Sequence, residues 1–552
     1  MSQQGKDLLS LCDRMFGQKE TWDSLCQEIG YFFAPHKADF TDEIYLGEEF
    51  ASHITDPTPL IMARDLGDSF GTMLRSEEWF KIAVDDDRIM NKQENRVFLD
   101  YMTEVTRSML YDKRGGFTRM AKEHEHDFAQ FGGGVSSINL NKQYDGFTCR
   151  NWHMRDTAFN TNDDNEIDRL GRKINTTARN CVTKFDGAPR AKVPQHLKET
   201  YDNDADAKVK LRHIAIPRDM YSEEVRNIPN DAKFVSVYLS DQGEVIQELP
   251  EMEFPYIVSR WRTVSGWGAY PFSPATMAAL PMSRGLQTMM QTFIEAGEKQ
   301  VDPPLIATSE AISSPVDITS GGITWVDAEY DERMGAPLVP LELGKNVKLG
   351  EAMLMTFHRL MGEALYISKL NMPQAAGEGT AYEMSQLIQQ NIRQLVPIFE
   401  PAQDEIVYRY LDRIVTTAMR LGAYGPIENI PRDLLAQNIT YTFNNPLQAE
   451  RDRKKAAQFQ EAMGIGSAAL QLDPSLATEL NPIQWVRDAM QGIGAPADWL
   501  KPEEIAMQER MQMAAQQQQQ QEQQQMAQMA DTLQRGGTGV NQIAQAEAAG
   551  AQ

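Results

Sequence analysis

Cysteine is scarce in this sequence, which has only four among its 552 residues: Cys12, Cys26, Cys149 and Cys181. They lie far apart and form no CxxC pair. Zinc ribbons and dithiol redox motifs need closely spaced cysteines, so neither class fits this chain. The spacing also gives no indication of a disulfide framework in so long a protein.

Long apolar runs are missing as well. No stretch approaches the roughly 18 apolar residues that a membrane-spanning helix needs. The first residues, MSQQGKDLLSLCDRMFG, have neither a basic start nor a long apolar core, the two marks of a secretory signal. We therefore expect the protein to be made and kept in the cytosol, or in a particle assembled there.

The chain has fewer positively charged than negatively charged side chains. The chain has 54 lysines and arginines against 78 aspartates and glutamates, a formal net charge of −24. Binding to the phosphate backbone is driven by lysine and arginine, so this composition argues against a repressor or a protein that coats DNA. It does not argue against a protein through which DNA passes without sticking.

The common catalytic motifs are also absent. The sequence has no GxxxxGK[ST] phosphate loop, no GxSxG elbow and no HExxH pair, which weighs against an ATP-driven motor, a serine hydrolase and a zinc protease. We predict that the protein is not an enzyme, with no catalytic residues, no metal and no cofactor.

One histidine pair, His124 and His126 in KEHEHDF, lies on a predicted helix. Residues two apart on a helix point to different faces, so the two histidines are poorly placed to bind one metal ion. We expect both histidines on a solvated helix surface.

Two acidic clusters have carboxylates that would suit a hard cation. One is formed by Asp85, Asp86 and Asp87, and the other by Asp163, Asp164, Glu166 and Asp168. The second cluster lacks the glycine and the closing glutamate of an EF-hand loop. The pattern favours charged turns between strands, and a metal-dependent nuclease remains an alternative that a cleavage assay with magnesium or manganese would separate.

Hydrophobic periodicity predicts an α+β body. Apolar spacings of three and four predict helices within residues 7–34, 58–76 and 93–131. A strand-like run, EEWFKIAV, follows the second of these. From the glycines of FGGGVSS to about residue 263, short β-branched and aromatic segments predict mainly strands and turns. The length of the chain favours several domains over one.

Two long helices with matching apolar stripes are predicted at residues 273–299 and 346–368. Ser273 and Pro274 provide the N-cap and the proline of a first helical turn, and Pro281 is expected to kink or restart that helix. The insert between the helices is rich in proline, glycine and β-branched residues. The methionines of the second helix are expected to serve packing: Met353, Met355 and Met361.

A third helix is predicted from the capping box formed by Thr380 and Glu383. Its interior prolines, Pro397 and Pro401, predict a kink. The connection before it, KLNMPQAAGEG, is small and almost without apolar anchors. Residues 516–525 are nearly pure glutamine, which fits either a disordered tail or a long helix that packs only beside other copies.

The order of these elements resembles one family. The resemblance rests on LGDSFGTMLRSEEWFKI, FTRMAKEHEHDFAQFGGGVSSI, GWGAYPFSPATMAALPMSRGLQTM, EKQVDPPLIA and GTAYEMSQLIQQNIRQLVPIFEPAQDE. Together, and over most of the chain, these stretches resemble the portal proteins, or head-to-tail connectors, of short-tailed (podovirus-type) bacteriophages. The segment GAYPFSPA departs from the family, which tends toward a turn richer in glycine and arginine.

The resemblance implies a ring subunit with an α+β wing, a two-helix stem, a small β-rich clip, a long kinked helix and a helical crown. The implied divisions are the wing at 1–272 and 380–445, the stem helices at 273–300 and 344–368, the clip at 301–343, a tunnel loop at 369–379, the crown at 446–500, and a glutamine-rich barrel or disordered tail at 501–552.

The resemblance also implies a function. Twelve subunits would form a ring at one capsid vertex, the channel for packaging and ejecting double-stranded DNA. The implied partners are the major capsid protein, the scaffolding protein, the terminase large subunit, the tail adaptor protein, internal core or ejection proteins, and the DNA in the channel. An internal scaffold or structural virion protein is the alternative, since it would share the acidic, helical, cysteine-poor composition without needing a helix–insert–helix block.

Three groups of site residues follow from the resemblance. The tunnel loop would line the channel with Lys369, Leu370, Asn371, Met372, Pro373, Gln374, Gly377 and Gly379. The stem candidates for contact with DNA are Arg284, Lys299, Lys345 and Lys348. In the clip, Ile323, Trp325 and Val326 lie in a β-like run too short to form its own core, and would pack against the neighbouring clip.

Overall fold

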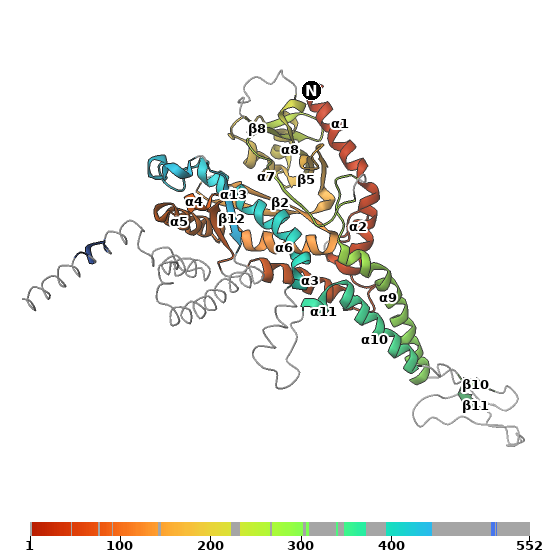
Figure 1. Cartoon of the computed structure of the whole chain (residues 1–552). Helices are drawn as coiled ribbons and strands as arrows, with labels where there is room; N and C mark the ends of the chain where they lie inside the picture. The colour runs from red at the N-terminus through yellow and green to blue at the C-terminus, as the bar shows by residue number, and fades with distance from the viewer. Residues whose placement is uncertain are drawn as a thin grey trace, which may run out of the picture. The chain divides into compact units, whose positions relative to one another are not determined.

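The structure is a computed structural model, and it combines helices with antiparallel sheets, which confirms the predicted α+β class (Figure 1). No helix in the part that it describes is long and apolar enough to cross a bilayer. The described residues are 3–45, 47–75, 78–90, 92–141, 145–221, 232–264, 268–301, 305–307, 338–340, 347–370, 393–435, 437–443, 509, 511–513 and 515.

The chain divides into two compact units. The first consists of Met1–Trp79, Val105–Ala423 and Phe443–Gln448, and the second of Phe80–Glu104, Tyr424–Thr442 and Ala449–Gln552. The first unit contains both larger sheets, the helical hairpin and both hollows discussed below.

A five-stranded antiparallel sheet in the order β4-β5-β6-β7-β8 is the largest sheet of the first unit. The order follows the sequence, so each strand pairs with the next through a short connection or one that carries short helices. The strands are β4 (Thr157–Thr161), β5 (Ile167–Thr177), β6 (Lys208–Pro217), β7 (Phe234–Ser240) and β8 (Val245–Glu251).

Both faces of this sheet are covered, because apolar residues alternate along β6. Ile214 and Ile216 face helix α1 (Gln3–Gln18), where they meet Leu8, Cys12 and Phe16. On the opposite face, Val209 and Leu211 pack against helices α7 (Ala178–Phe185) and α8 (Gln195–Asn203). Alternation with a period of two directs successive side chains to opposite faces of a strand.

Helices α7 and α8 correct the sequence analysis, which predicted mainly strands and turns up to residue 263. A signal for α7 was present, since Ala178, Cys181 and Phe185 have helical spacing and are buried. Thr177 caps the helix, its side chain accepting a hydrogen bond from the Asn180 N–H. Each helix is only two to three turns long, so the β-branched residues around it dominated the pattern.

A second sheet, in the order β3-β2-β9, packs on helix α6 (Phe117–Phe131). Its strands are β2 (Gly133–Leu140), β3 (Phe147–Trp152) and β9 (Ile257–Arg260). The predicted break at the triple glycine is confirmed: Gly132 ends α6 in the left-handed conformation, with φ at 82°, and β2 starts at the next residue. The Gly132 carbonyl then accepts a hydrogen bond from the Trp261 N–H just beyond β9.

Helix α6 is largely buried and carries several polar side chains into the interior. Glu125 receives two hydrogen bonds from Arg75, at 2.6 and 2.8 Å. Asp127 pairs with Lys37 and accepts a hydrogen bond from Asn151 at 2.7 Å. These partners come from three other places: the end of α3 (Thr58–Leu74), the short helix η1 (Pro35–Lys37) that follows α2 (Glu20–Phe33), and strand β3.

The expected solvated surface for the histidine pair is wrong for His124. This side chain is fully buried, and its Nε2 lies 2.7 Å from Ser259 Oγ. His126 points elsewhere and meets Asp68 at 3.1 Å. The two histidines therefore do face different directions, as expected, but one of them serves the core.

Pro281, Pro397 and Pro401 all lie inside helices, as predicted. Helix α9 (Pro274–Val301) runs through Pro281 without restarting. The helix that contains Pro397 and Pro401 is described from residue 393, and it changes to π geometry at η5 (Gln403–Tyr408) before α13 (Arg409–Arg420). Proline removes a backbone donor, and π-turns are a common cause of helix bending. The predicted start of this helix at Thr380 lies outside the described residues.

In the second unit the structure describes a two-stranded sheet of β1 (Phe80–Val84) and β12 (Ile439–Phe443). It also describes the helices α4 (Asp87–Met90), η6 (Ile427–Asn429) and η7 (Arg432–Leu434), and the first turns of α5 (Gln93–Leu110). Thr103 joins α5 to β1, because its Oγ1 accepts from the Ile82 N–H at 3.0 Å and donates to the Leu99 carbonyl at 2.8 Å. The glutamine-rich tail lies almost entirely outside the described residues.

Gly132→Ala tests the junction after α6. A Cβ there would lie 2.0 Å from the Phe272 carbonyl carbon, and the φ of 82° is itself unfavourable for alanine. We expect a loss of at least about 3 kcal/mol in unfolding free energy, measured by urea denaturation. Gly187→Ala is the matched control: φ is 71° but nothing lies within 4 Å, so it should cost only about 1 kcal/mol. Equal losses would contradict the packing argument.

Two buried histidines predict acid lability. Burial lowers the pKa of His124 to about 4 and that of His213 well below its usual value. A depressed folded-state pKa means that the stabilisation is complete above the unfolded pKa of about 6.5 and is lost as the pH falls through the folded value. For His124 the loss amounts to about 3 kcal/mol. Urea midpoints at pH 7.5 and 4.5 should show it, and His124→Gln should flatten the profile between them. An unchanged profile would count against this assignment.

Candidate functional site: the α9–α10 hairpin

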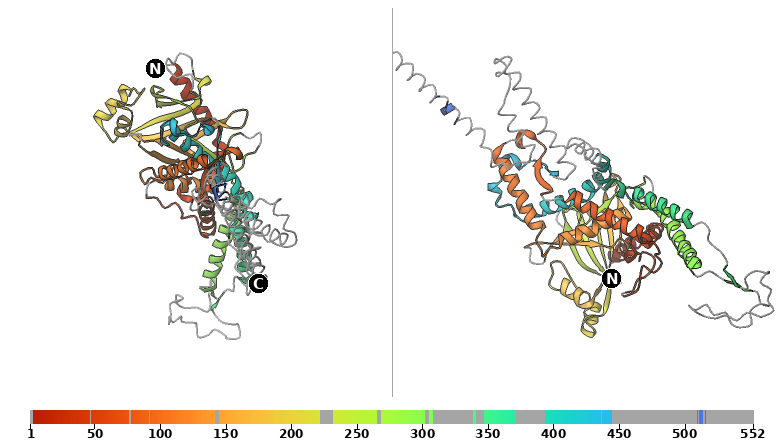
Figure 2. Two further views of the ribbon diagram at one scale, coloured as in Figure 1. Left: turned by 60° about the vertical axis from the view of Figure 1, so that its left-hand side comes forward. Right: turned by 90° about the horizontal axis from the view of Figure 1, so that it is seen from below.

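Helices α9 and α10 (Val347–Ala364) form an antiparallel hairpin, seen side by side in both views of Figure 2. Each helix offers a glycine to an aromatic ring of the other. A Cβ added to Gly285 would lie 3.0 Å from Phe357, and one added to Gly350 would lie 3.4 Å from Phe293. These two reciprocal contacts fix the register of the pair, because a shift by one turn would place a ring against a side chain.

The base of the hairpin is tied to α6. Ser273 Oγ donates to the Ala129 carbonyl at 2.7 Å, and Thr276 Oγ1 donates to the Gln130 carbonyl at 2.8 Å. Carbonyls in the last turn of a helix have no partner within that helix. The first turn of α9 supplies those partners, so the end of one helix fixes the start of the other. Ser273 is also the N-cap residue that the sequence predicted, since its Oγ accepts from the Thr276 N–H at 3.4 Å.

A polar strap holds the middle of the hairpin to the segment before α3. Gln287 Oε1 accepts from the backbone N–H groups of Thr55 and Asp56, both at 2.8 Å, and its Nε2 donates to the Asp56 carbonyl. The Asp56 carboxylate meets His358 Nε2 of α10 at 2.6 Å. Burial alone would raise the pKa of Asp56, but the hydrogen bonds from Thr58 and His358 outweigh it and lower that pKa. This strap was not predicted from the sequence, although Asp-Pro-Thr before a helix is a capping pattern.

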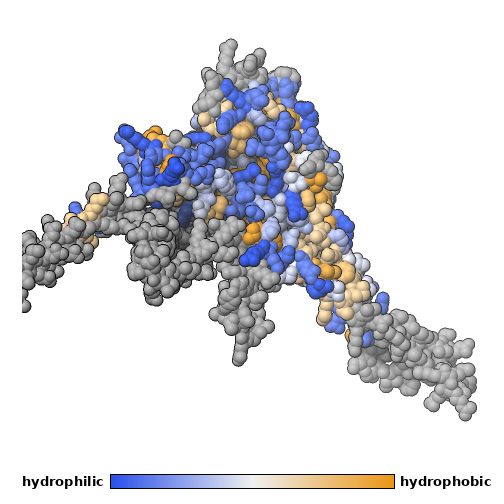
Figure 3. Space-filling view, viewed as in Figure 1, coloured by the Kyte–Doolittle hydropathy of each residue, from blue (hydrophilic) through white to orange (hydrophobic). Residues whose placement is uncertain are grey.

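Beyond the strap, the hairpin exposes apolar side chains (Figure 3). The exposed fractions are 43% for Ile294, 89% for Val301, 46% for Met353 and 63% for Met355. The predicted packing role holds within the chain only for Met361, which is fully buried. Contiguous exposed apolar surface of this kind commonly marks an interaction site.

The predicted cations that the structure describes are dispersed. Arg284 pairs with Glu28 of α2, its Nε lying 2.6 Å from Oε1. Lys299 lies 3.9 Å from Glu295 on the same helix, about 22 Å along α9 from Arg284 by the helical rise. Lys369, in α11 (Ile367–Leu370), sits 5.3 Å from the ring centre of Tyr366. They form no cluster.

Of the other predicted site residues, the structure describes only Lys348 and Leu370. Leu370 ends α11, and Lys348 belongs to α10 but its side chain is not described. The short strands β10 (Leu305–Ala307) and β11 (Leu338–Pro340) pair antiparallel at the base of the insert between the hairpin helices. The remaining positions lie outside the described residues: Lys345, Asn371, Met372, Pro373, Gln374, Gly377, Gly379, Ile323, Trp325 and Val326.

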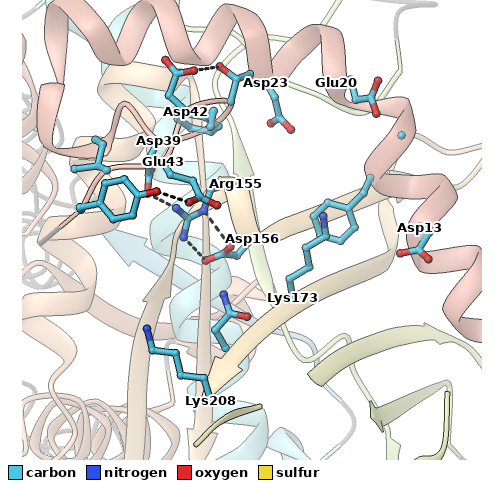
Figure 4. A pocket seen from close by; sticks show the side chains of 17 residues that line it. Asp13, Glu20, Asp23, Asp39, Asp42, Glu43, Arg155, Asp156, Lys173 and Lys208 are labelled. Atoms are coloured by element: carbon cyan, nitrogen blue, oxygen red, sulfur yellow. Dashed lines mark hydrogen bonds and ion pairs between the residues drawn. The ribbon is translucent and has the colours of Figure 1, made fainter. Parts of the chain in front are cut away.

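An acidic hollow of about 790 Å³ opens between α1, α2, the segment after η1 and strands β5 and β6 of the five-stranded sheet (Figure 4). Arg155 lies among its carboxylates and pairs with Asp39 and Asp156. Burial would raise the pKa of Asp39, but His153 and Arg155 lower it overall. Burial raises the pKa of Asp23 in the same wall. Seven carboxylates face three cations in this hollow, an environment that repels phosphate.

The two acidic clusters lie at turns of the chain or directly beside them. Asp163, Asp164 and Glu166 belong to the turn between β4 and β5, as expected for a charged turn. Asp85 and Asp86 lie between β1 and α4. Across the described ranges, no three histidine, cysteine, aspartate or glutamate side chains are placed to hold a metal ion.

The described residues thus define an α+β protein whose helical hairpin leaves apolar surface uncovered. The profile of a family described as "Bacteriophage head to tail connecting protein" matches residues 5–500. The chain belongs to that family.

Two curated relatives have portal names. The chain is 23% identical over 545 residues to the "Probable portal protein" of Bordetella phage BPP-1, covering 96% of this chain and 94% of the relative. It is 22% identical over 330 residues to the "Portal protein" of Salmonella phage epsilon15, covering 58% of this chain and 57% of that relative. The second match therefore spans little more than half of the relative's length.

Solved structures give a weaker likeness. A chain from the virion of a native gene transfer agent particle matches with a TM-score of 0.33 and 10% identity, covering 74% of this chain and 86% of that one. A chain from the neck of an empty particle of the same kind gives the same values. This likeness is too weak to carry over structural detail.

Gln287→Met tests the strap. Methionine keeps the length of the side chain but leaves the N–H groups of Thr55 and Asp56 without their acceptor. We expect a loss of about 3 kcal/mol in unfolding free energy, measured by urea denaturation. Gln291→Met, at an exposed position one turn along α9, is the matched control and should stay within about 0.5 kcal/mol of the parent. A similar loss in both variants would contradict a specific strap.

Proposed function

We propose that this chain is the subunit of a closed ring of twelve copies at one vertex of a phage capsid. The ring is the channel through which double-stranded DNA is packaged and later ejected. Membership of the head-to-tail connecting family supports this proposal, as do the portal names of its relatives. The wing, stem, clip, tunnel loop, crown and tail are proposed with the boundaries given in the sequence analysis.

The observation that carries the proposal is the uncovered apolar face of the α9–α10 hairpin. Each helix has one face packed against its partner and another exposed to solvent, with Met355 63% and Ile294 43% exposed. A neighbouring copy of the same hairpin is the simplest cover for that face. Interfaces between different faces of identical subunits close into rings when the rotation allows, and the strap keeps the hairpin in one orientation for such a contact.

The charge of the chain supports passage of DNA. A net charge of −24 weakens adhesion of the phosphate backbone, because attraction to phosphate decreases as the number of lysine and arginine contacts decreases. We assign contact with DNA to the loop from Lys369 to Gly379, with Arg284, Lys299, Lys345 and Lys348 as stem contacts. Arg284 and Lys299 each lie beside a glutamate, whose negative charge lowers the local attraction for phosphate without removing it.

The partners are proposed from the same role. The insert from residue 301 to 343 would dock the terminase large subunit during packaging and the tail adaptor afterwards, with Ile323, Trp325 and Val326 packed against the next copy. The major capsid protein, the scaffolding protein and internal core or ejection proteins would contact the rest of the ring. The proposed location is the portal vertex of the virion, after synthesis in the host cytoplasm.

An internal scaffold protein is the second candidate. It would also be a structural protein without enzymatic activity, but it would not need a closed ring. The assembly state of the purified protein separates the two.

Met355→Glu tests the ring interface. Burying a carboxylate in an apolar contact is costly, whereas on a free hairpin the exposed Met355 can be replaced without loss of folding. We expect closed rings with a central hole for the parent in negative-stain images and native mass spectra, and loss of most rings in the variant. Met220→Glu, at an exposed methionine of η3 (Arg218–Met220), is the matched control and should leave rings intact. A parent protein that stays monomeric would refute the proposed function.

A further inference from the structure

A second hollow, of about 600 Å³, lies between α3, α6 and η1. Its lining includes four lysines and arginines but only two carboxylates. This balance is unusual in a chain whose acidic residues exceed its basic ones by 78 to 54. The hollow is therefore a local positive surface on an acidic protein.

The lining of the hollow combines apolar and cationic side chains. Leu60 and Ile61 of α3 are its apolar part, and Ile61 is 42% exposed. Arg64, Arg119 and Lys122 are exposed and are called the rim cations below. Such a combination fits a peptide segment that carries one apolar side chain beside carboxylates, because the core of an interface favours apolar anchors and its rim favours polar contacts.

The rim cations are only partly neutralised within the chain. Arg64 pairs with the adjacent Asp65, and both side chains are about half exposed or more, a pairing worth little. Lys122 lies 3.0 Å from Asp68, an exposed pair, and Lys37 pairs with the buried Asp127. Arg119 is exposed and makes no ion pair with the described residues. Gln130, also in the lining, is 3% exposed, and its amide oxygen has no hydrogen-bond partner among the described residues. An unpaired buried polar atom favours a ligand that supplies a partner.

The same chain presents a segment of the complementary kind. Glu48 and Glu49 are exposed, and Phe50 beside them is 47% exposed. The segment is held in place at its end: His53 stacks on Tyr31 with ring centres 3.5 Å apart, and Thr55 is bound by Gln287. Holding a binding segment in one conformation lowers the entropy lost when it binds.

We infer that Glu48, Glu49 and Phe50 of one copy dock in the α3–α6 hollow of the next copy. Phe50 covers Leu60 and Ile61, while the two glutamates face Arg64, Arg119 and Lys122. Within one chain none of residues 42–56 lines this hollow, so the segment does not already occupy it. The contact joins two different surfaces, which is the kind of interface that builds a ring. This inference rests on the proposed ring.

Disulfide cross-linking tests the contact directly. All four native cysteines are buried, and burial raises the pKa of Cys12 to about 11 and that of Cys149 to about 12, so introduced thiols react first. Under mild oxidation, Phe50→Cys combined with Ile61→Cys should give a ladder of covalent multimers on non-reducing gels. Either single variant should give no species larger than a dimer.

Charge exchange is the second test, and it does not depend on the apolar contact of Phe50. Arg64→Glu with Arg119→Glu should weaken ring assembly at least about tenfold in the dissociation constant, because like charges then oppose each other. Adding Glu48→Lys and Glu49→Lys in the same chain should restore it. Reversing two exposed cations elsewhere, Arg179→Glu with Lys210→Glu, is the matched control and should leave assembly unchanged.

The outcomes separate this inference from the proposed function. Rings in the parent, a covalent ladder and rescue by charge exchange would support both. Rings in the parent without a ladder and without rescue would overturn the docking contact alone. A parent protein that forms no rings in native mass spectra would overturn the proposed function, and the inference with it.

Discussion

The first unit depends on one constraint: helix α6 is buried although its sequence is polar, so each buried polar group needs a partner. Arg75 meets Glu125, Lys37 and Asn151 meet Asp127, and Ser259 meets His124. Removing one member of a buried pair costs several kcal/mol, since the other is left unpaired. These requirements place the end of α3, helix η1 and strands β3 and β9 around one helix.

The same constraint reaches the hairpin through the end of α6. The carbonyls of Ala129 and Gln130 receive the hydroxyls of Ser273 and Thr276, and Gly132 leaves no room for a side chain beside Phe272. The start of α9 is therefore fixed by the core, and Gln287 fixes its middle. The base of the hairpin is thus held by the core, whereas the apolar surface farther along the hairpin is uncovered. A surface held in one orientation loses little entropy when another molecule covers it.

Elements with local patterns can be predicted from the sequence. The apolar periodicity of α1, α2, α3 and α9 predicts these helices, and the triple glycine predicts where α6 ends. Burial that depends on distant partners cannot be predicted in this way: His124 looks solvent-exposed because its neighbours are charged, and only Ser259, 135 residues away, makes its burial favourable. The Gln287 strap and the α3–α6 hollow were missed for the same reason. Their residues are separated by many tens of positions and follow no periodic pattern.

The distribution of positive charge ties these features to the proposed channel. Several cations are bound to partners inside the fold: Lys19 is buried and donates to the carbonyls of Met154 and Arg155, and Arg75 is bound to Glu125. On the hairpin, Arg284 and Lys299 are each beside a glutamate. A surface whose cations are already paired offers a polyanion little net attraction, and affinity for DNA falls with each phosphate contact that is lost. Pairing of the hairpin cations thus favours sliding over binding, which is what a conduit for DNA requires.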